Sequence, residues 1–289
     1  MRILILGKNG MLGKDMQKVF ADMDFVALGQ SDLDITDKEK VIETFMSVQP
    51  DVVINCTGYT NVDEAEKNVE MAEEINGYAV GVLARACREI DATFVHFSTD
   101  YVFRGEKKLG YNEEDGTNPI NVYGRSKMLG EQLIFDEMDS ISQENPKEGR
   151  YFIIRTSWLF GRHGKNFVDT MIENGKIKDT LQVVDDQHGK PTYTIDLCEQ
   201  VKWLITSHEY PSGVYHITNE GPTTWFAFAK KIFQLSNMKT RVVPCSSDDF
   251  RRPARRPKYS ILKNNALPKL RSWDEALEDY LKTTKSTKA

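Results

Sequence analysis

Tyr123 and Lys127 lie four residues apart in the segment NVYGRSK, residues 121–127. In a helix this spacing places a phenol and an ammonium on one face. The ammonium stabilises the phenolate and lowers the pKa of the tyrosine, so the phenol becomes a better proton donor near neutral pH. We therefore predict that Tyr123 and Lys127 are catalytic. The same spacing also occurs on solvated helix faces without any chemistry, so the prediction depends on the rest of the chain.

A third polar group comes from the segment FSTDYVF, residues 97–103, which follows an apolar stretch typical of a buried strand. Ser98 and Thr99 are therefore expected at the carboxyl end of that strand, where open α/β sheets bind ligands. From there the Thr99 hydroxyl can hold a substrate carbonyl at the point to which Tyr123 donates its proton. We predict that Thr99 is the third catalytic residue.

The segment GKNGMLG, residues 7–13, lies between an apolar run and a stretch with helical spacing. Its glycines Gly7, Gly10 and Gly13 permit a tight turn and a close approach of backbone to a pyrophosphate, and the helix N-terminus then supplies free N–H groups. A glycine-rich turn without a ligand is the alternative interpretation. Within a βαβ unit the pattern favours a dinucleotide. Together with the threonine and tyrosine further along, it predicts reduction of a C=O group by hydride from a nicotinamide.

The residues after the second expected strand bear on the choice of cofactor. NAD-binding units often carry an acid at this place for the ribose hydroxyls, whereas this chain has Gln30 and Ser31, with Asp32 slightly later. A carboxylate would repel the 2′-phosphate of NADP. We therefore predict NADPH as the cofactor, with NADH as the alternative, and contacts from Gln30 and Ser31. Asp34 and Ile35 could lie against the adenine.

Short apolar strands alternate with helical patterns through the first half of the chain. Thr36 and Glu39 form a capping box at the start of one expected helix. Apolar strands separated by helices indicate a parallel sheet covered on both faces. We predict an α/β fold with a doubly wound, Rossmann-like parallel sheet. The expected strands are residues 2–6, 25–28, 51–56, 92–98 and 151–160, and the expected helices are residues 11–23, 35–48, 70–90 and a segment that contains Tyr123 and Lys127.

The alternation weakens in the second half, where prolines and short elements increase. We predict a dinucleotide-binding domain over residues 1–157 and a smaller, mixed α/β substrate lobe over residues 158–282. Residues 192–208 are expected to pack back on the first domain. A polar loop is expected over residues 139–150, and a frayed tail over residues 283–289.

Composition excludes several classes of function. The net charge of the 289-residue chain is −5, which argues against general binding of nucleic acid. Apolar stretches are all shorter than a membrane span requires. The four cysteines are far apart, which predicts neither disulfides nor a zinc site and fits the cytoplasm. We expect His96 to be a packed strand residue and no metal to be bound.

The order of these motifs resembles that of the extended short-chain dehydrogenases/reductases and, more narrowly, the dTDP-4-dehydrorhamnose reductase family. The resemblance extends to about residue 262 and rests on segments such as GKNGMLG, DVVINCTGYTNVDEAE, HFSTDYVF, NVYGRSKMLGE, RTSWLFG, DDQHGKPT and RPKYSIL. It implies NADPH-dependent reduction of the C4 keto group of dTDP-4-dehydrorhamnose to dTDP-L-rhamnose, with the proton from Tyr123. The implied partner is a nucleotide-sugar, and the implied assembly is a monomer or a homodimer.

The resemblance also implies roles for individual residues. Thr99 and Asp100 would contact the sugar, and Trp158 would form a wall of its pocket. Arg256, in the basic segment RRPARRPK, residues 251–258, would bind the diphosphate of the nucleotide-sugar, for which a fork of donors is suited. A solvated basic loop is the alternative for this segment. The implied cofactor contacts are Gly7, Gly10, Met11, Leu12 and Gly13 at the pyrophosphate, Asp34 and Ile35 at the adenine, Gly58, Tyr59 and Thr60 in the loop that crosses the cofactor, and Tyr123 and Lys127.

Two other functions stay open at this point. The chain could reduce another nucleotide-linked 4-keto-6-deoxysugar, or it could be a non-catalytic NADP-binding regulatory subunit of the same fold. The complete set of Thr99, Tyr123 and Lys127 favours an enzyme, because a binding module does not need it. Some members of the family bind a metal through glutamates at a dimer contact. Asp15 stands at the first of those positions and the others have no match in this chain.

Overall fold

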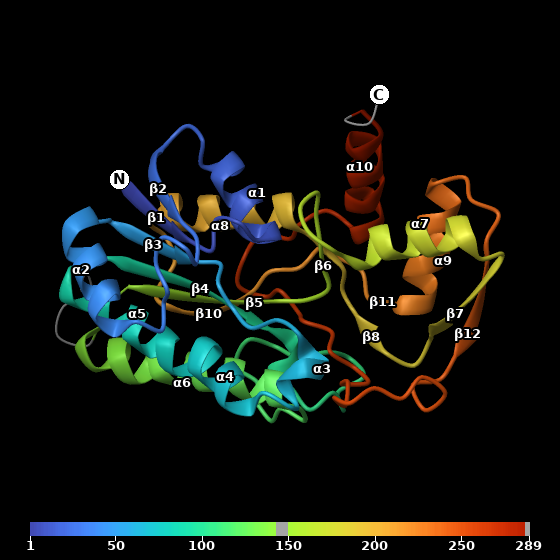
Figure 1. Ribbon diagram of the computed structural model, residues 1–289, viewed down its shortest axis with the longest axis horizontal. Coiled ribbons are helices and arrows are strands. Elements are labelled where there is room, and N and C mark those ends of the chain that lie inside the picture. Colours follow the sequence, from blue (N-terminus) through green and yellow to red (C-terminus); the bar gives the residue numbers. More distant parts are fainter. Residues whose placement is uncertain (143–149, 287–289) are drawn as a thin grey trace.

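The computed structural model describes residues 1–142 and 150–286 of the chain. Its larger lobe is built on a six-stranded sheet in which all strands run parallel (Figure 1). The strands follow the order β10, β5, β4, β3, β1, β2, so the winding reverses between β1 and β3. Such a switch point is where open α/β sheets bind ligands. The bounds are β1 Arg2–Leu6, β2 Asp24–Leu28, β3 Val52–Asn55, β4 Thr93–Thr99, β5 Tyr151–Thr156 and β10 Gly213–His216.

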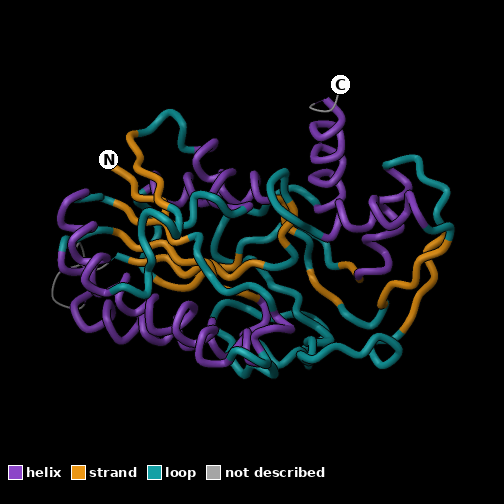
Figure 2. The backbone as a smooth tube through the Cα atoms, in the orientation of Figure 1, coloured by secondary structure: helices purple, strands orange, loops and turns teal. Residues whose placement is uncertain are grey.

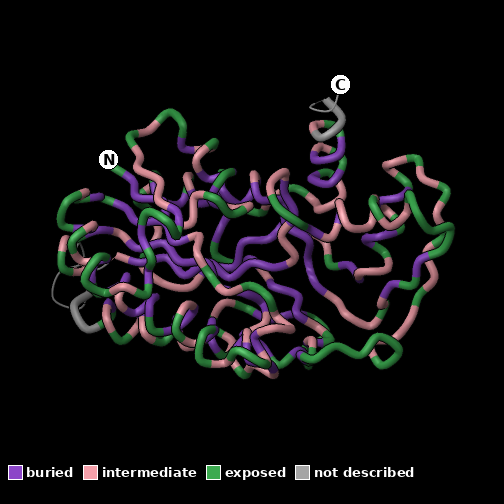
Figure 3. The backbone as a smooth tube through the Cα atoms, viewed as in Figure 1, coloured by how far each residue is buried: buried purple, intermediate pink, exposed green. Residues whose placement is uncertain are grey.

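Apolar side chains alternate between the two faces of this sheet, and helices bury both faces. Leu4 and Val53 pack in one cluster with residues of α2, α5 and α6, whereas Ile5 and Ile54 pack in a second cluster with residues of α1 and α8. Figure 3 shows the strands as the buried centre of this lobe. The predicted doubly wound, Rossmann-like fold is confirmed. The helix bounds are α1 Met11–Val19, α2 Lys38–Val48, α5 Ala79–Glu89, α6 Val122–Ser142 and α8 Thr194–Ser207.

The smaller lobe combines helices with two-stranded sheets (Figures 1 and 2). Its core is rich in aromatic side chains, among them Phe160, Phe228 and Tyr280. Strand β7 pairs in parallel with β12, β6 pairs in parallel with β9, and β8 is antiparallel to β11. This architecture agrees with the predicted mixed α/β lobe. The bounds are β6 Leu159–Phe160, α7 Phe167–Ile177, β7 Thr180–Val184, β8 His188–Gly189, β9 Thr192–Tyr193, β11 Thr223–Thr224, α9 Trp225–Leu235, β12 Arg241–Cys245 and α10 Trp273–Ser286.

After the smaller lobe begins, the chain returns to the sheet. Helix α8 lies against α1, where Lys202 Nζ donates to the Val19 carbonyl oxygen at 3.0 Å. Strand β10 then adds to the edge of the sheet beside β5. The short segment GVYH that forms β10 is missing from the predicted strands, because four residues carry too little periodicity to be recognised. The exact division between the lobes stays a prediction.

One prediction about the start of a helix is wrong, and one predicted helix contains an unexpected turn. Helix α2 begins at Lys38, and its cap is Asp37, whose side chain accepts from the Lys40 N–H, so Thr36 does not form the expected capping box. The predicted helix over residues 70–90 is confirmed, and it contains a π-helical turn that the pattern did not indicate. This segment consists of α4 Val69–Glu73, the π turn Glu74–Tyr78 and α5, and it follows the short helix α3 Val62–Ala65.

Two predicted ends also differ. Helix α6 continues to Ser142, so the expected loop does not begin at residue 139, and residues 143–149 lie outside the described residues. The expected frayed tail is wrong for residues 283–286, because α10 continues through them and Thr283 Oγ1 donates to the Asp279 carbonyl oxygen at 3.0 Å. Residues 287–289 lie outside the described part. Within that part, no helix has both the length and the apolar character that crossing a membrane demands.

Candidate active site

The glycine turn between β1 and α1 is formed by close contacts between backbone atoms. Gly7 has a φ of 84°, which favours glycine, and a Cβ at Gly13 would lie 2.1 Å from the Gly7 carbonyl oxygen. Gly10 is the N-cap of α1, and no described side chain caps the helix. Met11 and Leu12 form its first turn. The N–H groups and the positive end of the helix dipole are therefore left for an anion.

At the end of β2, the structure adds an ion pair that the sequence did not predict. Gln30 and Ser31 are exposed, as a ribose contact would need. The Asp32 carboxylate, however, accepts from the Gly29 N–H at 2.8 Å and pairs with Lys8 Nζ at 2.6 Å. The Lys8 ammonium, together with the Gly29 N–H, lowers the pKa of Asp32. Lys8 thus places a cation beside the end of β2, and the only sequence signal for it was its position inside the glycine turn.

Asp34 and Ile35, which were expected to contact the adenine, differ in burial. Ile35 is buried in the cluster that packs between the sheet and α5. Asp34 is exposed, and its Oδ1 accepts from the Thr36 N–H at 3.0 Å and from the Thr36 hydroxyl at 2.8 Å. Asp34 therefore orders the turn before α2, while Ile35 contributes mainly to packing.

The loop after β3 is held by a residue that the sequence did not single out. The Asn76 side chain accepts from the Tyr59 N–H at 2.8 Å and donates to the Tyr59 carbonyl oxygen at 2.9 Å. A Cβ at Gly58 would lie 3.2 Å from Asn76 Oδ1 and 3.9 Å from Lys127 Nζ. Thr60, which follows Tyr59 in the same loop, is exposed. Asn76 lies in the π turn, a geometry that often marks functional sites. Asn-Gly inside a helical pattern was the available signal.

Thr99 and Tyr123 are brought together at the end of β4. The Thr99 hydroxyl interacts with the Tyr123 phenol and acts to lower its pKa. The Thr99 hydroxyl also donates to Asp100 Oδ1 at 3.0 Å and accepts from the Tyr101 N–H at 3.2 Å. Tyr123 lies in the first turn of α6, and Lys127 follows one turn later. The Lys127 side chain is buried, and its Nζ lies 3.1 Å from His96 Nε2.

The titration of this pair differs from the prediction. Burial raises the pKa of Tyr123 to about 12, although the hydrogen bond from Thr99 acts in the opposite direction. Burial lowers the pKa of Lys127 to about 8, against the effect of the Glu131 carboxylate. The expected lowering of the tyrosine pKa by Lys127 is therefore wrong for this structure, because both groups are removed from water and the amine faces His96.

Asp100 adds a buried carboxyl group next to the same hydroxyls. It is 2% exposed, and burial raises its pKa to about 7. No described group hydrogen-bonds to its Oδ2 atom. Buried polar atoms are rarely left unpaired, so this oxygen is available to a ligand hydroxyl.

Arg256 faces a pocket of about 340 Å³ in front of Tyr101. Its guanidinium forms a two-point pair with Asp63, with Nη2 2.9 Å from Oδ2, and Nη1 also donates to the Ala254 carbonyl oxygen at 2.6 Å. Because the side chain is 17% exposed and paired, a solvated loop is wrong for this residue. Arg252 approaches the same Asp63 at 3.6 Å. Residues that line the pocket include Tyr101, Phe167, Gln182, Trp225, Arg252 and Arg256.

Trp158 is attached to this pocket through another tryptophan. Its ring stacks on that of Trp225 with 3.6 Å between centroids. Trp158 has a φ of 49°, and a Cβ at Gly189 would lie 2.6 Å from its indole. Trp225 lines the pocket, whereas Trp158 is not among its lining residues and supports the Trp225 ring from the other side.

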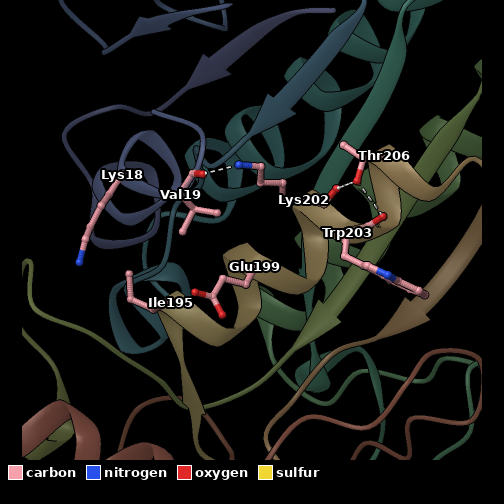
Figure 4. A pocket seen from close by; sticks show the side chains of 7 residues that line it. All are labelled: Lys18, Val19, Ile195, Glu199, Lys202, Trp203 and Thr206. Atoms are coloured by element: carbon pink, nitrogen blue, oxygen red, sulfur yellow. Dashed lines mark hydrogen bonds between the residues drawn. The ribbon is translucent and has the colours of Figure 1, made fainter. Parts of the chain in front are cut away.

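A second pocket, of about 420 Å³, is separate from these residues (Figure 4). It lies between α1 and α8, on the opposite face of the sheet from α6. Lys18, Glu199, Lys202 and Trp203 are among its lining residues, and none of the predicted site residues lines it. Its chemistry is unrelated to the cluster around Tyr123.

Comparison with known proteins identifies the family. The family model of the RmlD substrate binding domain matches residues 1–286. The chain belongs to this family. It is 40% identical to a dTDP-4-dehydrorhamnose reductase of Streptomyces griseus, over 96% of this chain and 92% of the relative. It is 38% identical to a dTDP-4-keto-6-deoxy-D-glucose reductase of Streptomyces niveus, over 96% of this chain and 95% of the relative.

A solved structure with the same fold is that of dTDP-4-dehydrorhamnose reductase from Bacillus anthracis in complex with NADP. It is 40% identical to this chain and covers 98% of it and 99% of its own chain, with a TM-score of 0.91. The resemblance drawn from the motifs is therefore confirmed. For this member of the RmlD family, the roles of the glycine turn and of Thr99, Tyr123 and Lys127 stay predictions, and Lys8, Asn76, Tyr101 and Trp225 were not among the predicted residues.

Proposed function

We propose that the chain is an NADPH-dependent reductase that converts the C4 keto group of dTDP-4-dehydrorhamnose to the alcohol of dTDP-L-rhamnose. The observation that carries the proposal is the position of the Thr99 hydroxyl beside the Tyr123 phenol, whose pKa it lowers against the effect of burial. It places two hydroxyls together at the carboxyl ends of the strands, where such sheets bind ligands. The reductase names of relatives that match almost the whole chain support it.

The residues at the switch point fit a dinucleotide. Gly7 and Gly13 pack with backbone against backbone, and the α1 N-terminus offers its N–H groups to a pyrophosphate. When bound, the nicotinamide supplies a hydride to the carbonyl carbon. Lys8 and the uncharged Gln30 and Ser31 at the end of β2 favour the 2′-phosphate of NADPH over NADH. The NADP complex of the Bacillus anthracis relative supports this choice.

Tyr123 is assigned as the proton donor. With its pKa raised to about 12, the phenol is protonated at neutral pH and can transfer its proton to a more basic alkoxide. The Thr99 hydroxyl, which donates to Asp100 Oδ1 in this structure, turns to donate to the same oxygen when the substrate is bound. Lys127, one helical turn away, returns a proton to the phenolate after each turnover. The unpaired Oδ2 of Asp100 is assigned to a sugar hydroxyl.

The pocket in front of Tyr101 is assigned to the nucleotide-sugar. Trp225 and Phe167 offer flat apolar surfaces for a base, and Arg252 and Arg256 offer positive charge for the diphosphate. Arg256 is held in place by Asp63, so its charge is positioned before the ligand arrives. Trp158 supports the wall through Trp225.

A second candidate differs only in the sugar. The relative from Streptomyces niveus is named for dTDP-4-keto-6-deoxy-D-glucose, so another 4-keto-6-deoxysugar is the alternative substrate. A non-catalytic NADP-binding subunit is not favoured, since the relatives are named as reductases and Thr99, Tyr123 and Lys127 are all present. The lobe boundary near residue 157, a monomeric or homodimeric state and a cytoplasmic location also belong to the proposal.

The test is a substrate panel with the purified chain. NADPH absorbance is followed with dTDP-4-dehydrorhamnose and with dTDP-4-keto-6-deoxy-D-glucose, and the product is identified by NMR. We expect the highest kcat/KM with dTDP-4-dehydrorhamnose and formation of dTDP-L-rhamnose. A higher kcat/KM with the other sugar would transfer the assignment to the second candidate. Absence of NADPH consumption with either would overturn both.

A further inference from the structure

A chain of buried polar side chains leads away from Lys127 into the sheet. Lys127 Nζ lies 3.1 Å from His96 Nε2, and His96 Nδ1 lies 3.1 Å from Asn55 Nδ2. Asn55 Oδ1 then accepts from the Thr57 N–H at 3.0 Å and from the Thr57 hydroxyl at 2.6 Å. Asn55 and His96 are neighbours in the β3–β4 register and are both 0% exposed. Asn55 and His96 lie behind the catalytic residues and have no role in the mechanism above.

The directions of these hydrogen bonds are determined by the one group that can only donate. The backbone N–H of Thr57 requires an oxygen, so Asn55 must turn its Oδ1 towards Thr57 and its NH₂ towards His96. His96 Nδ1 therefore accepts. A neutral imidazole carries one N–H, which must then be on Nε2, facing Lys127. The Lys127 nitrogen can accept that hydrogen bond only as a neutral amine, because an ammonium has no lone pair.

We propose that Asn55 and His96 are positioning residues that fix one imidazole tautomer and thereby favour the neutral amine of Lys127. The inference rests on the role proposed above for Lys127 in returning a proton to Tyr123. A lysine that is stabilised only as an ammonium would give up its proton poorly. The His96 Nε2–H group, which points at the Lys127 nitrogen, stabilises the neutral amine and makes release of the ammonium proton easier. Lys127 can therefore alternate between ammonium and amine during turnover.

The surrounding charges agree with this direction. Burial, followed by the charge of Lys127, holds the pKa of His96 well below its usual value, so the ring is neutral. Burial lowers the pKa of Lys127 to about 8. Glu131 on α6 acts in the opposite direction, but Arg155 on β5 pairs with its carboxylate at 2.7 and 2.9 Å, and Ser98 on β4 donates to it. Tyr123 and Asp100, the other titratable groups named at this site, are both buried.

The substitution Asn55→Asp reverses the direction of the hydrogen bonds from residue 55 to His96 and Lys127. The side chain keeps almost the same shape. One carboxylate oxygen still accepts from Thr57, but the other now accepts from a hydrogen on His96 Nδ1. The Nε2 atom then becomes an acceptor that stabilises the Lys127 ammonium, and the added negative charge acts in the same direction. Asn237→Asp, at an exposed position, is the control for the added charge.

The experiment combines nitrogen NMR with a pH profile. In wild-type protein labelled with ¹⁵N in histidine and lysine, we expect the Nε2–H tautomer of His96 and a Lys127 midpoint near pH 8. The His96 signal, one of five histidines, is assigned by its loss in His96→Gln. In Asn55→Asp we expect the Nδ1–H tautomer and an alkaline limb of kcat that moves upward by about one pH unit or more. Asn237→Asp should match the wild type.

Two results would overturn the inference. The first is a wild-type His96 that carries its proton on Nδ1, or on both nitrogens, at neutral pH, and this result needs no variant to fold. The second is a changed tautomer in Asn55→Asp with an unchanged Lys127 midpoint. The spectra do not depend on turnover. If only the proposed reductase activity fails, His96 will still carry its proton on Nε2, but the protein will consume no NADPH.

Discussion

The glycine turn and the basic segment 251–258 are both assigned to phosphate groups, but they are constructed differently. At the turn, Gly7 and Gly13 remove side chains so that backbone N–H groups can face the ligand. At the basic segment, Arg256 supplies a side chain that is held by Asp63, 193 residues away in the sequence. A backbone site depends on local residues, whereas a side-chain site depends on partners that folding brings together. The two sites should therefore respond differently to substitution.

The largest effect is expected at the proton donor. Tyr123→Phe keeps the ring but removes the hydroxyl beside Thr99 that donates the proton, so kcat should fall by roughly two orders of magnitude or more. NADPH affinity should be unchanged, because the glycine turn is untouched. Steady-state kinetics and a cofactor titration measure the two quantities. Turnover close to wild type would remove Tyr123 from the mechanism.

A smaller effect is expected at the side-chain phosphate site. Arg256→Ala removes a charged donor and leaves Asp63 without its two-point partner, so KM for the nucleotide-sugar should rise about tenfold to a hundredfold. Lysine at this position should restore only part of the affinity, since it cannot make the two-point contact. Arg251→Ala, at an exposed position of the same segment, is the matched control. An unchanged KM in Arg256→Ala would assign the diphosphate to Arg255 or Lys258.

The backbone site is tested by adding a single methyl group. In Gly13→Ala the new Cβ would lie 2.1 Å from the Gly7 carbonyl oxygen, so the turn must shift. Overpacking of this kind costs about 1–3 kcal/mol, and NADPH affinity should fall about tenfold while KM for the sugar changes little. Gly116→Ala, where a Cβ would meet nothing within 4 Å, is the control. Equal NADPH affinity in both variants would show that the turn does not hold the cofactor.

The smallest effect concerns the choice between the two cofactors. Ser31→Asp introduces a carboxylate at the end of β2, where Lys8 is already paired with Asp32. Repulsion between two exposed charges is about 1 kcal/mol, so the preference should shift roughly fivefold from NADPH towards NADH. Ser31→Asn is the uncharged control, and titration with both cofactors measures the ratio. A wild-type preference for NADH would contradict the assignment of this region to a 2′-phosphate.

Several features of the molecule could be predicted because they depend on neighbouring residues. The apolar runs of β1, β3 and β4 predicted the parallel sheet, and the glycines after β1 predicted the tight turn that follows it. The four-residue spacing placed Tyr123 and Lys127 on one helix, and the position of Thr99 at the end of β4 placed its hydroxyl beside them. Local hydrogen bonding and periodicity are sufficient for these conclusions.

Tertiary structure alone decided which partners the charged and polar groups have. The Lys127 nitrogen contacts His96, Arg256 is held by Asp63, and Lys8 pairs with Asp32. The direction of a pKa shift follows from burial and from these partners, so the predicted effect of Lys127 on Tyr123 was reversed when both side chains proved to be buried. Sequence by itself determined the sheet, the glycine turn and the residue types of the site. Their hydrogen-bond partners were determined only when distant strands and helices packed together.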